Sequence, residues 1–115
     1  MKHSDMVRQL KKDGALIVTQ MTPEKADLLH MAVGVAGEGG ELLDAVKRHT
    51  IYDKSLDREN VVEELGDIEF FLEGLRQRLG ITRDETLEHN IAKLGVRYTD
   101  HQYSDEQAQQ RRDKQ

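Results

Sequence analysis

A long helix-forming segment in the first half of the chain most constrains its fold. The segment opens with Thr22 and Pro23, a residue that caps helices well followed by one that suits the first helical position. Apolar residues then recur at helical spacing as far as about Lys47 or Arg48. The sequence therefore predicts one long helix, against which the rest of a short chain has to pack.

A second long helix is predicted beyond a polar loop with the sequence HTIYDKSLD. It starts after Asp57 and runs to Leu79, where Gly80 can adopt the left-handed backbone conformation that ends helices. A third helix begins at the capping box formed by Thr82 and Glu85. Its apolar residues share one face: Leu87, Ile91, Leu94 and Tyr98. This order predicts an all-α fold of two long antiparallel helices plus a third.

The two ends of the chain carry weaker signals. Ser4 can cap a short helix that ends near Gly14, and the following ALIVTQM is expected to be an apolar connector or a short extended piece. Ser104 can cap a last segment, SDEQAQQRRDKQ, whose lack of an apolar stripe predicts a frayed helix or a disordered tail. We therefore divide the chain into a short helix and connector over 1–21, a helical domain over 22–100 and a polar tail over 101–115.

The composition agrees with a small helical domain. Of the 115 residues, 34% are charged and 4% are aromatic, and there is a single proline. Such a composition favours helices over a β-sandwich. A domain of this size buries only a small core, so we expect the helical bundle to be completed by oligomerisation.

Charge and hydropathy exclude several classes of function. The net charge of −5 argues against binding a nucleic-acid polymer, which needs a basic face, but not against a small anionic ligand held through metal ions. The absence of cysteine excludes disulfides and thiolate metal sites. The first residues, MKHSDMVRQLKKDG, lack the apolar run of a signal peptide, and no stretch is apolar enough for a membrane span. We therefore expect a cytoplasmic protein without a membrane partner.

One carboxylate of the second long helix falls on its apolar face. At about 100° per residue, Glu64 lies inside the apolar arc and Asp67 lies about 60° away, close to Phe71. The arc itself consists of Val61, Ile68, Leu72, Leu75 and Leu79. A carboxylate in such a place is costly unless it is paired or bound to a metal ion.

The first long helix carries a second pair of carboxylates. Glu38 and Glu41 are one helical turn apart, so their side chains can reach a common point. The full pattern is E-x-x-E, 22 intervening residues and E-x-x-D, and two antiparallel helices would bring the pairs face to face. Four carboxylates without cysteine or histidine at that spacing suit Mg²⁺, or alternatively Mn²⁺.

Three alternatives remain open for these carboxylates. An E-x-x-E pair is common on solvated helix faces. Glu64 could instead pair with an arginine such as Arg76 or Arg97. A di-iron site in a helical bundle is the third alternative, but it uses Glu-x-x-His motifs, and neither pair here has a histidine in that position.

Four glycines interrupt the first long helix around its glutamates, although each costs about 1 kcal/mol relative to alanine in a helix interior. On the helical wheel, Gly34 and Gly37 share a side with Glu41, so we expect them to clear space for a ligand. Gly39 and Gly40 point elsewhere and are expected to let another helix pack closely.

Further candidate ligand contacts are His30 and a basic face on the third helix. Asn90, Lys93 and Arg97 recur at i, i+3 and i+7 and share this face, from which the two cations could clamp a polyphosphate. The alternative is a solvated face whose cations pair with acidic residues of the same helix. His30 lies a little over two turns before the first glutamate and could contact a base or sugar, or it is a partly exposed histidine without a role.

Two segments of the sequence resemble a known family. GVAGEGGELLDAVKR and VVEELGDIEFFLEGLRQRLGITRDETLEHNIAKLGVRY are similar to the MazG-like all-α nucleoside triphosphate pyrophosphatase superfamily. The resemblance covers roughly residues 29–98 and rests on four blocks in order: GE-x-GEL, EELGD, LGIT and N-x-x-KL-x-x-RY. One departure is Gly39, where the family more often has alanine.

The resemblance implies a helical bundle, usually assembled as a homodimer or homotetramer, and Mg²⁺-dependent hydrolysis of a nucleoside triphosphate to the monophosphate and pyrophosphate. The metal-ligand motif of the family falls on Glu38, Glu41, Glu64 and Asp67. Its basic motif falls on Lys93 and Arg97 as phosphate contacts, with Asn90 a nearby candidate. In the implied reaction, Glu38 or Glu41 orients or deprotonates the water that attacks the α-phosphorus.

Two other functions are compatible with the same residues. The first is a non-catalytic helical module that binds a nucleotide or a partner helix without turnover. The second is hydrolysis of a phosphoribosyl nucleotide within the same superfamily. The base and sugar preference of the substrate is not predicted.

Overall fold

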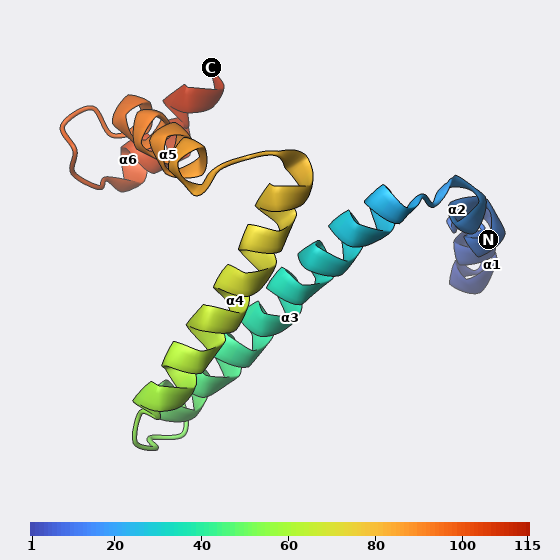
Figure 1. The fold of residues 1–115 in the computed structure, drawn as a ribbon, viewed down its shortest axis with the longest axis horizontal. Helices are drawn as coiled ribbons and strands as arrows, with labels where there is room; N and C mark the ends of the chain where they lie inside the picture. Colours follow the sequence, from blue (N-terminus) through green and yellow to red (C-terminus); the bar gives the residue numbers. More distant parts are fainter.

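The computed structural model describes all 115 residues, and its regular elements are all helices, with no strand (Figure 1). The prediction of an all-α fold is therefore confirmed. In chain order the elements are α1 (His3–Leu10), α2 (Gly14–Gln20), α3 (Pro23–Thr50), α4 (Arg58–Leu79), α5 (Arg83–Arg97), α6 (Asp105–Gln110) and a short 3₁₀ turn, η1 (Arg112–Lys114). No helix combines the length and the apolar character needed to span a membrane.

The predicted starts and stops of the long helices are confirmed. The side chain of Thr22 accepts a hydrogen bond from the backbone N–H of Lys25, and Asp57 caps α4 in the same way. Gly80 ends α4 with a φ of 69°, in the left-handed region that glycine adopts without strain. Thr82 caps α5 as predicted. The main difference is that α3 continues to Thr50, into the segment predicted as loop.

The predictions for the first 20 residues are partly wrong. Helix α1 starts at His3 without a side-chain cap, so Ser4 does not cap it. The segment ALIVTQM, expected to be a connector or extended piece, is helical in α2 up to Gln20. The physical reason is local: Asp13 accepts a hydrogen bond from the backbone N–H of Ala15 and caps this segment, whereas a short apolar run alone does not distinguish helix from strand.

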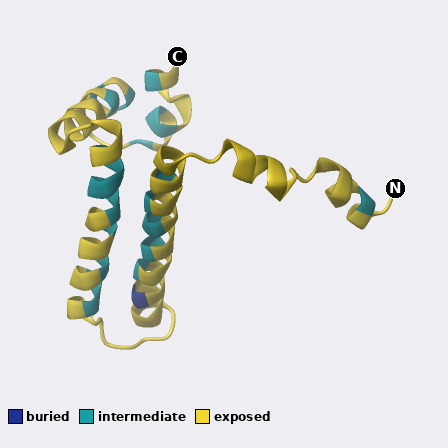
Figure 2. Cartoon of the chain, turned by 45° about the vertical axis from the view of Figure 1, so that its right-hand side comes forward, coloured by how far each residue is buried: buried dark blue, intermediate teal, exposed yellow.

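The α3–α4 hairpin is the main tertiary contact of the chain. Figures 1 and 2 show the two helices side by side and antiparallel, connected by the loop at residues 51–57. Two glycines allow the close approach. A Cβ atom at Gly34 would overlap the ring of Phe71, and one at Gly74 would overlap the sulfur of Met31. Each glycine of this kind admits a large side chain from the opposite helix.

The C-terminal elements form a second, smaller unit. Helix α5 packs against α6 and η1, at the end of α4 away from the loop (Figure 1). Ser104 caps α6 as predicted, and the polar tail therefore forms a short helix of six residues. The ion pair between Arg97 and Asp113 joins α5 to η1.

Very little of this chain is buried within itself. Ala45 is the single buried residue, and the half-buried positions of the hairpin follow the facing sides of α3 and α4 (Figure 2). The accessible surface is 9465 Å², whereas a compact monomer of 13.2 kDa exposes about 6,400 Å². The radius of gyration of 19.6 Å also exceeds the roughly 13 Å of a compact chain of this length. A single copy therefore exposes about 3,000 Å² more than a finished domain would.

Candidate metal centre

The antiparallel hairpin brings carboxylates of α3 and α4 together. One oxygen from each of Glu38, Glu64 and Asp67 lies within 4.8 Å of the others. We call these three residues the acidic trio. Glu38 and Glu64 are half-buried between the helices, and Asp67 is exposed at the rim. The trio therefore forms one cluster of carboxylate oxygens rather than a set of separate surface charges.

Glu64 has the most unusual environment of the trio. Its Oε2 atom is buried and has no hydrogen-bond partner. The pKa of Glu64 is raised from 4.5 to about 7, first because its carboxyl shares a hydrogen bond with Glu38 and next because it is partly buried. The negative charges of Glu38, Asp67 and Glu41 raise this pKa further. The site thus favours a bound positive charge, either a proton or a cation.

Glu41 lies at the edge of this site. It is exposed and stands outside the acidic trio, although its charge contributes to the raised pKa of Glu64. Because it is one turn of α3 from Glu38, it is on the same side of the helix as the trio. Of the four carboxylates predicted as metal ligands, the structure therefore gathers three and places the fourth beside them.

The arginines considered as partners of Glu64 are engaged elsewhere. Arg76 lies 3.7 Å from both Glu69 and Glu73 of the same helix, α4. The Nε atom of Arg97 donates a hydrogen bond of 2.8 Å to Asp113 in η1. The alternative in which an arginine of this chain neutralises Glu64 is therefore absent from the structure.

The donor set fits a hard divalent cation. All of its ligand atoms are carboxylate oxygens, and no cysteine is present in the chain. The unpartnered Oε2 of Glu64 is the kind of buried acceptor that a metal ion satisfies. Oxygen ligands alone favour Mg²⁺, Mn²⁺ or Ca²⁺ over softer metals.

The roles predicted for the glycines need correction. Gly34 does not clear space for a ligand, because the ring of Phe71 fills the space next to it. Gly37 is open, with no atom within 4 Å of a Cβ added there, so a ligand could still approach it. Gly39 and Gly40 are open as well, and no helix of this chain packs against them. The helical wheel shows which side of α3 each glycine faces, but it cannot show that Phe71 of α4 fills the space beside Gly34.

His30 stands on α3 beside the ring of Phe71. The two rings meet edge to face with their centroids 6.2 Å apart. The imidazole is exposed. His30 therefore lies on the hairpin, about two helical turns from Glu38.

The basic residues of α5 are not brought to the acidic trio within one chain. Arg97 holds Asp113 through both nitrogens of its guanidinium edge, at 2.8 and 3.3 Å. Lys93 borders a cleft of about 430 Å³ between α5 and the C-terminal turn, and Asn90 is exposed on the same helix. These residues do not reach the acidic trio because the turn after Gly80 directs α5 away from the hairpin (Figure 1).

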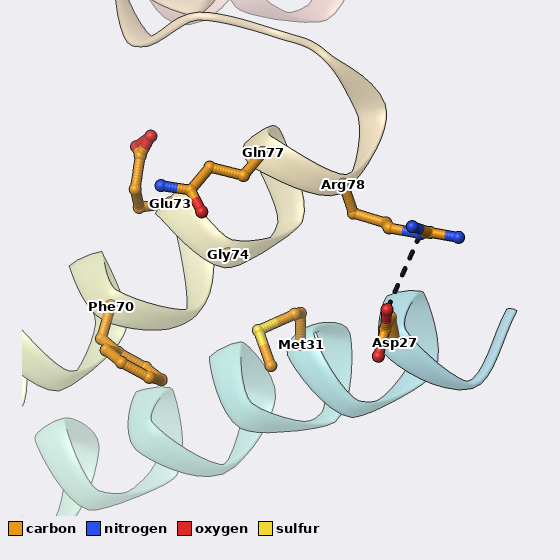
Figure 3. A pocket seen from close by; sticks show the side chains of 7 residues that line it. All are labelled: Asp27, Met31, Phe70, Glu73, Gly74, Gln77 and Arg78. Atoms are coloured by element: carbon orange, nitrogen blue, oxygen red, sulfur yellow. Dashed lines mark ion pairs between the residues drawn. The ribbon is translucent and has the colours of Figure 1, made fainter. Parts of the chain in front are cut away.

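A cavity of about 660 Å³ at the open end of the hairpin was not predicted from the sequence. Figure 3 shows its lining at the open end of the hairpin: Asp27, Met31, Phe70, Glu73, Gly74, Gln77 and Arg78. Phe70 is 67% exposed, and Arg78 forms an ion pair with Asp27 at 3.7 Å in this lining. Met31 and Gly74 are each seven residues from a member of the trio, so the cavity continues on the same side of the hairpin about 10 Å away.

A signal for this cavity was present in the sequence. Gly74 interrupts an otherwise regular helix and lies seven residues after Asp67, a spacing that puts both on one side. A glycine there indicates a close approach to the opposite helix, and in the structure the side chain of Met31 from that helix packs against Gly74.

No model of a known protein family, no curated protein and no solved structure matches this chain significantly.

Proposed function

We propose that this protein is a Mg²⁺-dependent nucleoside triphosphate pyrophosphohydrolase of the MazG-like type. The observation that carries the proposal is the half-buried carboxyl of Glu64 beside Glu38 and Asp67, whose Oε2 atom has no hydrogen-bond partner. These residues belong to the GE-x-GEL and EELGD blocks on which the resemblance rests. A carboxyl whose pKa is raised to about 7 by neighbouring carboxyls and partial burial is typical of a functional site.

Glu38, Glu64 and Asp67 would hold the metal, with Glu41 as the fourth ligand. When bound, Mg²⁺ supplies charge neutralisation for phosphate oxygens and makes a water more acidic. The cost of keeping three carboxylates within 4.8 Å of one another then becomes a source of affinity for the cation.

The chain itself would provide the base for hydrolysis. Glu38 or Glu41 orients the attacking water and accepts its proton. The water oxygen forms a bond to the α-phosphorus, the bond from the α-phosphorus to the bridging oxygen breaks, and pyrophosphate leaves with that oxygen. Glu41 is exposed at the rim, where a water and a substrate can reach it, whereas Glu38 is half-buried.

The cavity at the open end of the hairpin is suited to the nucleoside part of the substrate. Phe70 and Met31 offer an exposed ring and a thioether to a flat base, and polar residues line the rest. His30 and Gly37 lie on the exposed side of α3 near the trio and remain candidate substrate contacts. Lys93, Arg97 and Asn90 can contact the phosphates only if α5 of the same chain moves or if α5 of another copy approaches.

The test is release of pyrophosphate by the purified protein with Mg²⁺, measured over a panel of ribonucleoside and deoxyribonucleoside triphosphates and a phosphoribosyl nucleotide. We expect turnover of at least one triphosphate and its loss in Glu41→Gln and Asp67→Asn. Glu63→Gln is the matched control, because Glu63 is an exposed neighbour on α4 outside the trio. Full activity in both ligand variants, or no turnover of any nucleotide together with no effect of Mg²⁺ on thermal stability, would contradict the proposal. Turnover of the phosphoribosyl nucleotide alone would change the substrate class.

A further inference from the structure

The C-terminal unit contains a cleft of its own, away from the acidic trio. It has a volume of about 430 Å³ and lies where the end of the chain packs beside α5 (Figure 1). Half of its lining comes from one side of α5, at helical spacing: His89, Ala92, Lys93 and Val96. The other half comes from η1 and the residue after it: Arg112, Asp113, Lys114 and Gln115.

Three cations line this cleft without a partner in the chain. Lys93, Arg112 and Lys114 form no ion pair, and their side chains donate no hydrogen bond. Lys93 is half-buried on α5, whereas the two cations of η1 are exposed. Positive charges that converge without a counter-charge repel one another, so an anion bound among them is stabilised by all three.

The one carboxylate side chain in the lining is already neutralised. Asp113 accepts hydrogen bonds from Nε and Nη2 of Arg97, at 2.8 and 3.3 Å, and its side chain is 6% exposed. The charges of this ion pair cancel, so the three other cations are left unbalanced by the side chains around the cleft. The same ion pair holds η1 against α5 and so fixes the turn that carries Arg112 and Lys114.

The size and the charge of the cleft favour a small anion over a polymer. Pockets for small molecules have volumes of about 300–1,000 Å³, and this cleft lies in the lower part of that range. The chain as a whole carries a net charge of −5, so a nucleic acid would be repelled by the rest of the molecule.

The chemistry of the cations favours phosphate groups. Ammonium and guanidinium groups bind phosphate oxygens through charge-assisted hydrogen bonds. One cation belongs to α5 and two belong to η1, so a single ligand can be contacted from both elements. An anion with two linked phosphate groups offers oxygens and charge to both, whereas a single phosphate offers fewer of each.

We propose that this cleft binds a small anion with linked phosphate groups through Lys93, Arg112 and Lys114. The exposed imidazole of His89 provides a further hydrogen-bond donor at the edge of the cleft. The bound anion connects α5 to η1 and therefore stabilises the C-terminal unit. The proposal does not depend on the proposed activity, because no residue of the acidic trio takes part. Lys93 acts here in the observed position of α5, without the movement that contact with the trio would need.

The test is calorimetric titration of the full chain with inorganic pyrophosphate and with inorganic phosphate, both in the presence of a chelator. Without metal the acidic trio repels anions, so binding at the proposed active site does not contribute. We expect saturable binding of pyrophosphate, weaker binding of phosphate, and changes in amide chemical shifts in α5 and η1 but not in the hairpin. The absence of saturable pyrophosphate binding, or shift changes confined to α3 and α4, would overturn the proposal.

Charge-removing variants test which residues form the site. Arg112→Gln and Lys114→Gln should each raise the dissociation constant for pyrophosphate about tenfold or more, the loss expected for a hydrogen bond between charged groups. Arg111→Gln is the matched control, because it removes the same charge from the neighbouring position, which is exposed and does not line the cleft. An equal effect of Arg111→Gln would show a diffuse attraction rather than a site, and no effect of Arg112→Gln and Lys114→Gln would show that the anion binds elsewhere. Either result would overturn the proposal.

Discussion

Two carboxylates that are both largely withdrawn from solvent differ in what surrounds them. Asp113 in the C-terminal unit has a side chain only 6% exposed and accepts hydrogen bonds from Nε and Nη2 of Arg97. This hydrogen-bonded ion pair holds the pKa of Asp113 below its ordinary value. Glu64 in the hairpin has no cationic neighbour, and its pKa is raised to about 7.

The difference separates a structural contact from a candidate site. An ion pair with complementary geometry satisfies the charges of both partners and connects two elements of the chain. A half-buried carboxylate among other carboxylates makes the empty hairpin less stable and is compensated only when something positive binds. The following predictions test this contrast, in order of decreasing effect.

The largest effect is expected for Glu64→Gln. The amide keeps the shape of the side chain but removes the charge that attracts the metal, so pyrophosphate release should fall about a hundredfold or more, beyond the range seen for residues that merely support a metal ligand. The increase of thermal stability on adding Mg²⁺ should disappear as well. Calorimetric titration with Mg²⁺ measures the loss directly. Unchanged Mg²⁺ binding in this variant would show that Glu64 is not part of the site.

Alanine substitutions at two glycines of α3 are expected to change the stability of the protein in opposite directions, with a difference of a few kcal/mol between them. Gly34→Ala places a methyl group into the ring of Phe71 and should destabilise the hairpin by about 1–3 kcal/mol. Gly37→Ala has free space and should stabilise α3 by up to about 1 kcal/mol through helix propensity. Denaturant unfolding measures both. Gly37→Leu should weaken substrate binding more than folding, and comparable losses of both would contradict the role of Gly37 at the site.

The pH dependence of stability should have opposite signs in the two regions when metal is removed with a chelator. The pKa of Glu64 is raised in the folded chain, so its protonated carboxyl favours folding. This contribution to folding stability is fully present below about pH 4.5 and is lost as the pH rises toward about 7. The lowered pKa of Asp113 acts in the opposite sense, so its contribution is lost on acidification. Thermal melts of the wild type and Glu64→Gln between pH 5 and 8 should therefore converge at low pH and separate at high pH. A constant difference across this range would contradict the assignment.

The smallest effect is expected for Asp113→Asn. Loss of the ion pair should loosen η1 from α5, and amide hydrogen exchange should become faster in α6 and η1 but not in the hairpin. Glu88→Gln, an exposed substitution on α5, is the control. If exchange in α3 and α4 also increased, the two regions would not be independent units.

The sequence predicted the hairpin well because its boundaries depend on local chemistry. Thr22, Asp57 and Gly80 act through backbone conformation and hydrogen bonds within a few residues, and all three end or begin a helix as expected. Helix α2 was missed because Asp13 was not recognised as its cap. The cavity beside Phe70 and the packing of Phe71 on Gly34 depend on which side chains meet across two helices.

The sequence by itself determined that the chain is helical, where the two long helices begin, where α4 ends, and that Glu64 lies on an apolar face. These properties follow from residue spacing and from caps, which act within one helix. Only the tertiary structure decided that Glu38, Glu64 and Asp67 meet, that Gly34 serves packing, and that Arg97 holds Asp113 instead of reaching the acidic trio. The physical reason is that each of these contacts joins residues far apart in the chain, so it depends on how whole helices are placed relative to one another.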